Sequence, residues 1–384
     1  MVKIQTFREG DRVRIVKGAH SGGHGKVVGA GDTCVASQVS NIVVQSRHAL
    51  GGHMPTQLTP TPRTNKRSPK PARPETQTKH RLVSMFSGCG GMDLGFRGGF
   101  SFLGQFYEHL PFDLIWANEI NEAACRTFKN NLHHDIICDD VWQVLDSLPQ
   151  STDVLIGGFP CQDISVNNGK GKGVDGKRSG LYTAMVEAIR RTQPSVFVAE
   201  NVKGLILKKN ESSLKRVLAD FRALDYDVTY HLYQAANFGV PQTRERVLIV
   251  GTRPGQPGFT PPSEIVQSKK DRVTAYQAIC DLENIPENDL ISHIWSRAKK
   301  SPEQGSRYLK KDRPGYTIRA ECHGNIQWHY KLPRRMSMRE AARIQSFPDY
   351  FFFDAKIRET ERMVGNAVPP VLAWHIAGSV LRSL

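Results

Sequence analysis

The stretch Gly157-Gly158-Phe159-Pro160-Cys161-Gln162 follows the apolar run 153–156, and together they predict a buried strand that ends in a tight turn. Ligands of an open α/β sheet bind beyond the carboxyl ends of its strands, so the turn places Cys161 where chemistry is expected. The two glycines let the backbone pass close to a bound molecule, and Pro160 restricts the approach to the thiol. A lone cysteine is more often a small buried apolar residue, so the role of Cys161 depends on the rest of the chain.

Composition narrows the class of protein before any motif is considered. The 384 residues are 39% hydrophobic, enough for two or three globular domains, and carry a formal charge of +15 that suggests a polyanionic partner such as nucleic acid. We expect no membrane span and no secretion signal, because no apolar run is long enough and the N-terminus is polar. The seven cysteines include no CxxC pair, which indicates neither a metal site nor a disulfide framework and favours a reducing cytoplasm.

The first 80 residues differ from the rest of the chain. Residues 1–50 alternate apolar and basic side chains around Val13, with further strands expected at Lys26–Val28 and Asn41–Gln45. The stretch 11–29 resembles the KOW element of SH3-like barrels, which often contacts nucleic acid or protein, although a purely structural appendage is an equal alternative. Residues 51–80 are rich in proline and basic residues, which predicts a disordered linker that acts as a tether or adds nonspecific phosphate contacts.

The order of elements from residue 81 predicts a pocket for a nucleoside. A strand at 81–86 runs into a glycine-rich turn and a helix, and the next strand, 113–118, ends at Glu119. An acid there can accept hydrogen bonds from ribose hydroxyls, and an acid after the third strand, Asp139 or Asp140, could accept one from an adenine amine. No phosphate-binding motif is present, so a cofactor without phosphates is expected.

The second half of the pattern places an acid beside Cys161. A glycine- and lysine-rich loop at 167–177 and a helix lead to the strand 195–199, which ends at Glu200. We expect this strand to neighbour the strand that leads to Cys161. Further on, alternation puts Gln242, Arg244 and Arg246 on one face, which suits either anion contact or a solvated charged surface.

The periodic pattern of strands and helices is lost over residues 252–335, which predicts a separate, irregular, basic module. Regular elements are expected again after it. Ser337 to Glu340 forms a capping box that opens a helix, and Gly365–Pro370 predicts a tight turn before a closing helix. We therefore predict an α/β, doubly wound, Rossmann-like sheet at 81–251, completed by helices at 336–384. A smaller domain at 252–335, a β unit at 1–50 and a linker at 51–80 accompany it.

Taken together, residues 81–384 resemble the DNA (cytosine-5) methyltransferase family, of the bacterial restriction–modification type. The resemblance rests on ordered motifs: Phe86-Ser-Gly-Cys-Gly-Gly, Glu119, Gly158-Phe-Pro-Cys-Gln, Glu200-Asn-Val, Gln242-Thr-Arg-Glu-Arg, Arg339-Glu-Ala-Ala-Arg-Ile-Gln-Ser-Phe-Pro and Gly365-Asn-Ala-Val-Pro-Pro. It implies methyl transfer from S-adenosylmethionine to C5 of a cytosine flipped out of duplex DNA, giving 5-methylcytosine.

The same resemblance implies roles for single residues. Cys161 would add to C6 as a thiolate, Glu200 would protonate N3 and bind the amine, and Arg246, with Arg244 as a further candidate, would hold the base or its phosphate. The cofactor would meet Phe86, Gly88, Gly90, Gly91, Glu119, Asp140, Val141, Pro160, Leu181, Asn366 and Val368. DNA contacts would come from Gln242, Lys170, Lys172 and Thr317, the last within the target-recognition region 252–335.

Several alternatives remain at this point. A tRNA cytosine-5 methyltransferase of the same fold would give the KOW-like unit a purpose. A catalytically inactive DNA-binding homologue is a second possibility, although the intact Cys161, Glu200 and Arg246 argue against it. A thiol hydrolase would need a histidine beside Cys161, and no motif supplies one. We expect a monomeric enzyme of the bacterial cytoplasm, associated with the nucleoid.

Overall fold

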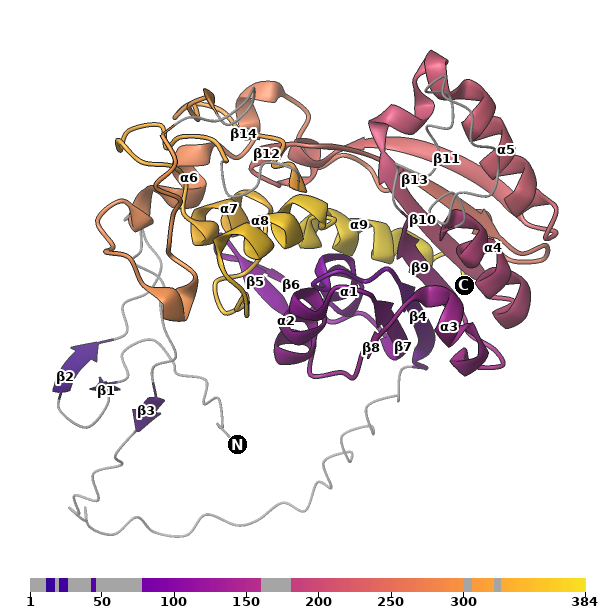
Figure 1. Cartoon of the computed structure of the whole chain (residues 1–384), viewed down its shortest axis with the longest axis horizontal. Helices are drawn as coiled ribbons and strands as arrows, with labels where there is room; N and C mark the ends of the chain where they lie inside the picture. Colours follow the sequence, from indigo (N-terminus) through magenta and orange to yellow (C-terminus); the bar gives the residue numbers. More distant parts are fainter. Residues whose placement is uncertain are drawn as a thin grey trace, which may run out of the picture. The chain divides into compact units, whose positions relative to one another are not determined.

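The computed structural model describes residues 78–159, 181–299, 306–320 and 326–384, together with three strands nearer the N-terminus (Figure 1). The chain divides into two compact units, Met1–Thr78 and Lys79–Leu384. The predicted linker up to residue 77 lies outside the described residues.

The N-terminal strands form a small antiparallel sheet in the order β2-β1-β3. β1 (Arg12–Lys17) pairs with both β2 (Ser21–Lys26) and β3 (Val43–Gln45). The first and third strands lie where the alternation predicts them. The second was expected at Lys26–Val28 but begins at Ser21, because the glycine-rich run itself pairs with β1. The KOW identity of this sheet stays a prediction.

The second unit is built on a seven-stranded sheet in the order β11-β13-β10-β9-β4-β7-β8. Its strands are β4 (His80–Met85), β7 (Phe112–Glu119), β8 (Ile137–Cys138), β9 (Val154–Gly158), β10 (Val196–Val202), β11 (Asp227–Gln234) and β13 (Glu245–Thr252). The pairs from β10 to β8 are parallel, whereas β13 runs antiparallel to both of its neighbours. This is the α/β sheet that the sequence predicts.

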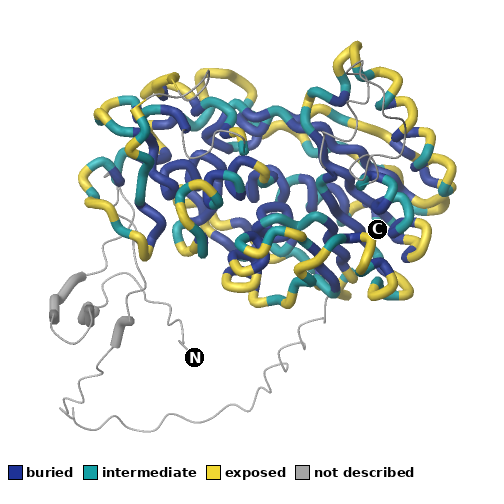
Figure 2. Tube along the Cα trace, in the orientation of Figure 1, coloured by how far each residue is buried: buried dark blue, intermediate teal, exposed yellow. Residues whose placement is uncertain are grey.

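Both faces of the sheet are buried, because successive strand residues enter different cores. Val154 and Ile156 join one core with residues of α1 (Gly91–Arg97), α2 (Glu122–Leu132) and α9 (Pro370–Leu381). Leu155 joins the other, with residues of α3 (Val141–Val144), α4 (Leu181–Thr192) and α5 (Glu211–Arg222). Figure 2 shows the strands as the dark centre of this unit. Helices on both faces are the hallmark of a doubly wound sheet.

The topology fixes where a site can lie. From β4 the chain builds outward through β7 to β8, and it then returns to place β9 on the other side of β4. Strand order therefore reverses between β4 and β9, and ligands bind at such a switch point, beyond the carboxyl ends of the strands.

The region after β13 has few regular elements. It holds α6 (Ala275–Ile279), short 3-10 turns at Lys269–Asp271, Cys280–Leu282 and Asp289–Ile291, and β14 (Gly315–Tyr316), which pairs with β12 (Gln242–Thr243). The capping box at Ser337 opens α7 (Met338–Ile344), as predicted. The elements that were not predicted include the hairpin of β5 (Phe100–Phe102) with β6 (Gln105–Tyr107), and α8 (Ile357–Asn366).

The last two helices form an apolar stretch. Ile357–Leu381 is long and apolar enough to span a membrane by composition, but 67% of the tested window is buried inside the protein. The turn Ala367–Pro369 also separates it into α8 and α9. These features are those of core helices.

Candidate active site

A buried ion pair lies at the carboxyl end of β10. The carboxylate of Glu200 forms an ion pair with Arg246, with Oε1 2.6 Å from Nε, and both side chains are about nine-tenths buried. Arg246 reaches it from β13, which pairs with β10, and its Nη1 also donates to the carbonyl of Glu245 at 2.8 Å. Because the pair is withdrawn from solvent, the orientation of the carboxylate is fixed and its charge is weakly screened.

Glycine at position 158 makes room for this carboxylate. Gly158 is the partner of Glu200 in the parallel register of β9 and β10. A Cβ added to Gly158 would stand 2.9 Å from Oε2 of Glu200. The predicted neighbourhood of the two strands is therefore confirmed, and the second glycine of the Gly-Gly-Phe-Pro-Cys turn has a defined steric role.

Asn201 holds the backbone that leads to Cys161. Its side-chain amide donates to the carbonyl of Phe159 at 3.0 Å, and its Oδ1 accepts from the amide of Val202 at 2.9 Å. The side chain is buried. Pro160, Cys161, Lys170 and Lys172 lie outside the described residues, so their predicted roles stay predictions. Asn201 fixes the position from which that segment departs.

Arg244 and Gln242 lie in the protein interior. Both side chains are fully buried. Arg244 donates through Nη1 to the carbonyl of Ile318 at 2.9 Å and through Nη2 to the carbonyl of Gly365 at 2.7 Å. Gln242 donates to the carbonyl of Ile344 and accepts from the amide of Ile318 at 3.0 Å. The predicted alternation is correct, but these contacts favour structural roles and do not support DNA contact by Gln242 or substrate contact by Arg244.

Thr317, the remaining described residue predicted to contact DNA, is held by β12. Its hydroxyl donates to the carbonyl of Thr243 at 2.7 Å, and the hydroxyl of Thr243 donates to the carbonyl of Gly315 at 3.0 Å. Thr317 is half-buried, so part of its surface stays accessible.

The glycine-rich turn after β4 is shaped by close packing on one side and open space on the other. Gly88 and Gly90 have φ values of +55° and +89°, and Phe86 shares this left-handed conformation at +53°. A Cβ at Gly90 would lie 2.5 Å from Leu132, and one at Gly91 would lie 2.6 Å from the carbonyl of Val368. A Cβ at Gly88 would meet nothing within 4 Å. The turn is therefore tightly packed at Gly90 and Gly91, and it leaves open space over Gly88.

Glu119 braces this turn from the end of β7. Its Oε2 accepts from the amide of Gly88 at 2.9 Å, while Oε1 accepts from the amides of Ile120 and Asn121 at 3.0 and 2.9 Å. Each carboxylate oxygen can accept about two hydrogen bonds, so Oε2 keeps acceptor capacity for a ligand hydroxyl.

The other predicted cofactor residues come from four elements. Asp140 caps α3 by accepting from the amide of Trp142 at 2.9 Å, and Val141 behind it is buried. Leu181 begins α4 and is half-buried. Asn366 ends α8 and is exposed, whereas Val368 is buried in the turn before α9, with its carbonyl beneath Gly91. The structure thus brings the first and last motifs together.

Sequence reasoning missed a buried acid next to the glycine-rich turn. Asp93, in α1, is buried, and desolvation raises the pKa of its carboxyl from 3.8 to about 6, although the nearby Ser84 hydroxyl acts in the opposite direction. Ser84 also shares a 2.8 Å hydrogen bond with Ser87 of the turn. Asp93 reads as an ordinary first-turn helix acid, so the sequence contains no signal of its burial.

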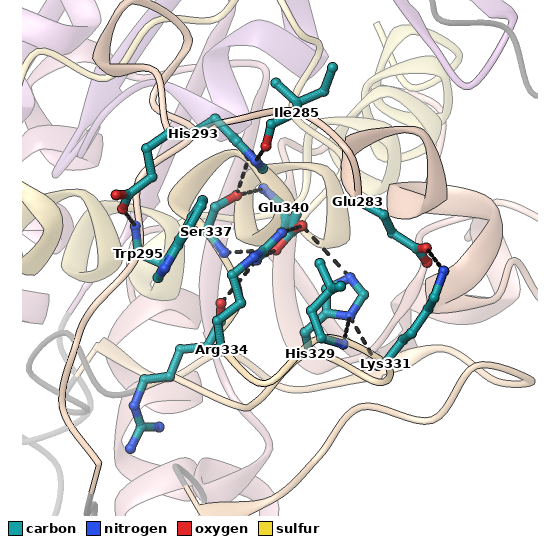
Figure 3. A network of polar contacts seen from close by, with 12 residues as sticks. Glu283, Ile285, His293, Trp295, His329, Lys331, Arg334, Ser337 and Glu340 are labelled. Atoms are coloured by element: carbon teal, nitrogen blue, oxygen red, sulfur yellow. Dashed lines mark hydrogen bonds and ion pairs between the residues drawn. The ribbon is translucent and has the colours of Figure 1, made fainter.

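A network of buried polar groups fixes the irregular region to α7 (Figure 3). Glu340 accepts from both terminal nitrogens of Arg334, at 2.8 and 2.7 Å, and from the amide of Ser337 at 2.8 Å. The hydroxyl of Ser337 shares a 2.8 Å hydrogen bond with His293, and Arg334 lies 4.3 Å from the ring centre of Trp295. Burial lowers the pKa of His293. The irregular region after β13 is thereby held to the helix that follows it.

The described groups are suited to acid–base chemistry and to the binding of a nucleoside. Among the residues that the structure describes, no group of three or more histidine, cysteine, aspartate or glutamate side chains could hold a metal ion. A buried acid paired with arginine can hold a proton at a ring nitrogen, and the turn with Glu119 can hold a ribose.

The family described as C-5 cytosine-specific DNA methylase matches residues 80–311 and 293–382. The type II methyltransferase M.NgoFVII of Neisseria gonorrhoeae is 34% identical over 339 residues, which cover 80% of this chain and 87% of that protein. The type II methyltransferase M.AplI of Arthrospira platensis is 34% identical over 325 residues, which cover 81% and 88%.

Solved structures agree on the fold. A putative DNA modification methyltransferase encoded within an E. coli prophage aligns with a TM-score of 0.59 at 22% identity, covering 79% of this chain and 99% of that chain. The Dnmt2 methyltransferase of S. pombe aligns with a TM-score of 0.57 at 16% identity, covering 79% and 98%. At these identities the likeness concerns the fold alone, and it confirms the predicted methyltransferase sheet.

Proposed function

The chain belongs to the C-5 cytosine-specific DNA methylase family and is a DNA (cytosine-5-)-methyltransferase; from that premise we propose that it methylates one cytosine within a short duplex sequence as the modification enzyme of a type II restriction–modification system. The observation that carries the proposal is the Glu200–Arg246 pair at 2.6 Å, beside the strand end that leads to Cys161. The bacterial type II methyltransferases among its relatives support the restriction–modification setting.

The residues around the glycine-rich turn fit S-adenosylmethionine. The space over Gly88 suits the methionine part, Glu119 has acceptor capacity for ribose, and Asp140 or Asp139 would accept from the adenine amine. Phe86, Gly90, Gly91, Val141, Leu181, Asn366 and Val368 would complete the pocket, with Pro160 from the neighbouring turn. S-adenosylmethionine supplies an electrophilic methyl group when bound.

The chain's own residues then perform the addition chemistry. The Cys161 thiolate adds to C6 of cytosine, and N3 takes a proton from Glu200, so that the C5–C6 double bond opens and C5 becomes nucleophilic. Once C5 has taken the methyl group, N3 returns its proton to Glu200 and the C5 proton leaves to a base. The S–C6 bond breaks to restore the Cys161 thiolate, and the ring regains its double bond. Arg246 would hold Glu200 and the base oxygen, while Asn201 keeps the path to Cys161 in position.

The base must leave the helix for this reaction, because its ring carbons are shielded in the duplex. The loop at 167–177, with Lys170 and Lys172, would close behind it on the phosphate backbone. We propose that residues 252–335 read the target sequence in the major groove.

Charge and aromatic rings on the described part of that region support this assignment. Tyr308 is exposed and stacks on Trp328, with ring centres 5.7 Å apart and an interplanar angle of 23°. Arg307, which precedes Tyr308, is exposed, as are Lys310 and Lys311, which follow it. Cations of this kind bind phosphates, and exposed rings can contact bases.

The test is methyl transfer from labelled S-adenosylmethionine to unmethylated duplex DNA and, separately, to tRNA, with wild type beside Cys161→Ala. We expect label in DNA only, at one recurring sequence found by base-resolution mapping of 5-methylcytosine, and none from the variant. Label confined to tRNA would overturn the DNA assignment, and substantial turnover by Cys161→Ala would remove Cys161 from the mechanism. We also expect a monomer in the bacterial cytoplasm, which light scattering and cell fractionation can check.

A further inference from the structure

Two thiols meet beside Glu119. Cys125 lies in the first half of α2 and is buried, whereas Cys138 ends β8 and is exposed. The Cys125 Sγ donates to the carbonyl of Glu119 at 3.4 Å, and the Cys138 Sγ lies 4.0 Å from the carbonyl of Ile120. Those carbonyls belong to consecutive residues, so the two thiols lie beside the same short segment of backbone.

The fold explains this proximity of residues thirteen positions apart in the sequence. β8 pairs in parallel with β7, and Cys138 is the register partner of Glu119. α2 begins immediately after β7, capped by Asn121, whose side chain accepts from the amide of Ala124 at 2.9 Å. The first turns of α2 therefore pass over the end of β7, where β8 also ends.

We propose that Cys125 and Cys138 are a modification site for hydrogen peroxide, at which a reversible disulfide forms and weakens binding of the cofactor at Glu119. The disulfide rests on the geometry of the two thiols alone. Its effect on the cofactor rests in addition on the proposed function of Glu119.

The exposed thiol reacts first. The Cys138 thiolate attacks one peroxide oxygen, the O–O bond breaks, and a proton from solvent completes a water molecule, leaving Cys138 as a sulfenic acid. The Cys125 sulfur then attacks the Cys138 sulfur, the S–S bond forms, and the departing hydroxide takes the Cys125 proton to become a second water. Two thiols are oxidised and one hydroperoxide is reduced by two electrons. Burial raises the pKa of the Cys125 thiol, which keeps it protonated and unreactive in the first step.

The disulfide changes the surroundings of Glu119 in two ways. A disulfide carries no S–H donor, so the carbonyls of Glu119 and Ile120 lose the hydrogen bonds that the thiols provide. A disulfide also ties the first turns of α2 covalently to the end of β8, whereas the two free thiols leave these elements unlinked. Glu119 lies between them and accepts from the amides of Ile120 and Asn121, so the orientation of its carboxylate changes with that link.

The experiment uses the full chain with Cys161→Ala, because peroxide would also oxidise the proposed nucleophile. Trypsin places Cys125 on peptide 98–126 and Cys138 on peptide 130–170, which otherwise also contains Cys161. After treatment with hydrogen peroxide, mass spectrometry should find these peptides linked, with two hydrogen atoms lost. Calorimetry should show S-adenosylhomocysteine binding about tenfold more weakly, with recovery on addition of dithiothreitol.

Two matched variants separate the pair from general oxidation. Adding Cys138→Ser should abolish both the linkage and the loss of affinity, since serine can still donate to the carbonyl of Ile120. Adding Cys280→Ser should change neither, because Cys280 lies in the irregular region after β13.

Absence of the linked peptides would overturn the proposal, and so would a linkage that leaves S-adenosylhomocysteine affinity unchanged. A reduced protein that does not bind S-adenosylhomocysteine at all would instead overturn the proposed cofactor and the effect on its binding, while the peptide map would still decide whether the disulfide forms.

Discussion

Glu200 lies directly across from Gly158 on neighbouring parallel strands, and the space that a side chain at 158 would fill is occupied by the glutamate's carboxylate. The acid is thus held by Arg246 on one side and accommodated by a missing side chain on the other. Its orientation depends on a residue that carries no functional group.

Gly158→Ala should reduce methyl transfer by about tenfold or more while the protein stays folded. The added Cβ would stand only 2.9 Å from Oε2 of Glu200, so the carboxylate would be pushed out of its position. The measurement is kcat on DNA, with thermal unfolding and S-adenosylhomocysteine affinity measured alongside. Gly378→Ala, in α9, is the matched control, since a Cβ there meets nothing within 4 Å. An active Gly158→Ala enzyme would show that Glu200 tolerates displacement.

Glu200→Gln should lower kcat by about a hundredfold or more, the usual contribution of a general acid, with cofactor affinity unchanged. Glu245→Gln is the comparison, because Glu245 pairs with the half-exposed Lys203 at 3.0 Å and lies next to Arg246 in the chain. Single-turnover rates on the mapped DNA site would measure both variants. Equal rates for Glu200→Gln and wild type would exclude Glu200 as the proton donor.

Arg244→Met should lower the free energy of unfolding by about 3 kcal/mol, because two buried carbonyls lose a charged donor. Denaturant unfolding measures this, and Arg253→Met, which removes one exposed 3.1 Å contact to Gln193, should cost less than about 1 kcal/mol. Unchanged stability combined with lost methyl transfer would instead support contact between Arg244 and the substrate.

Asp93 should make stability fall as the pH rises through its titration. Burial raises the folded-state pKa of its carboxyl from 3.8 to about 6, so the folded state retains a proton that the unfolded state has lost between these values. The resulting penalty grows from about pH 4 to pH 6 and stays constant above, at most about 3 kcal/mol.

Asp93→Asn should therefore stabilise the protein at pH 8 and leave it unchanged near pH 4. Urea unfolding at both pH values measures the difference, and Asp113→Asn, at an exposed acid 3.8 Å from Lys79, provides the control. A variant with the same pH dependence as wild type would contradict the assignment.

The parts of the fold that follow from local pattern were predictable. The helix at Glu122–Leu132 follows from local pattern, because its apolar face repeats at helical spacing and Asn121 caps it. The capping box at Ser337 and the adjacent strands of Gly158 and Glu200 follow in the same way. The motif order then locates the acid and the glycine-rich turn.

What could not be predicted depends on tertiary contacts. Alternation places Gln242 and Arg244 on one face, but it does not reveal that β14 and α8 cover that face and supply carbonyl partners. The partnership of Cys125 with Cys138 is likewise set by strand register, and the cysteine spacing contains no signal of it. Helix α8 was missed because most of its first turns are charged and it ends in the motif that predicts a turn.

The packing of α9 on α1 has a consequence for biosynthesis. Gly95 of α1 would bring a Cβ within 2.4 Å of Ala373, and Gly91 lies against the carbonyl of Val368, so the floor of the glycine-rich turn comes from residues near the end of the second unit, which are synthesised long after the turn itself. The nascent chain must complete almost the whole second unit before this floor exists. A ligand stabilises only the state that binds it, so the cofactor can stabilise the completed fold but cannot assist the early steps of folding.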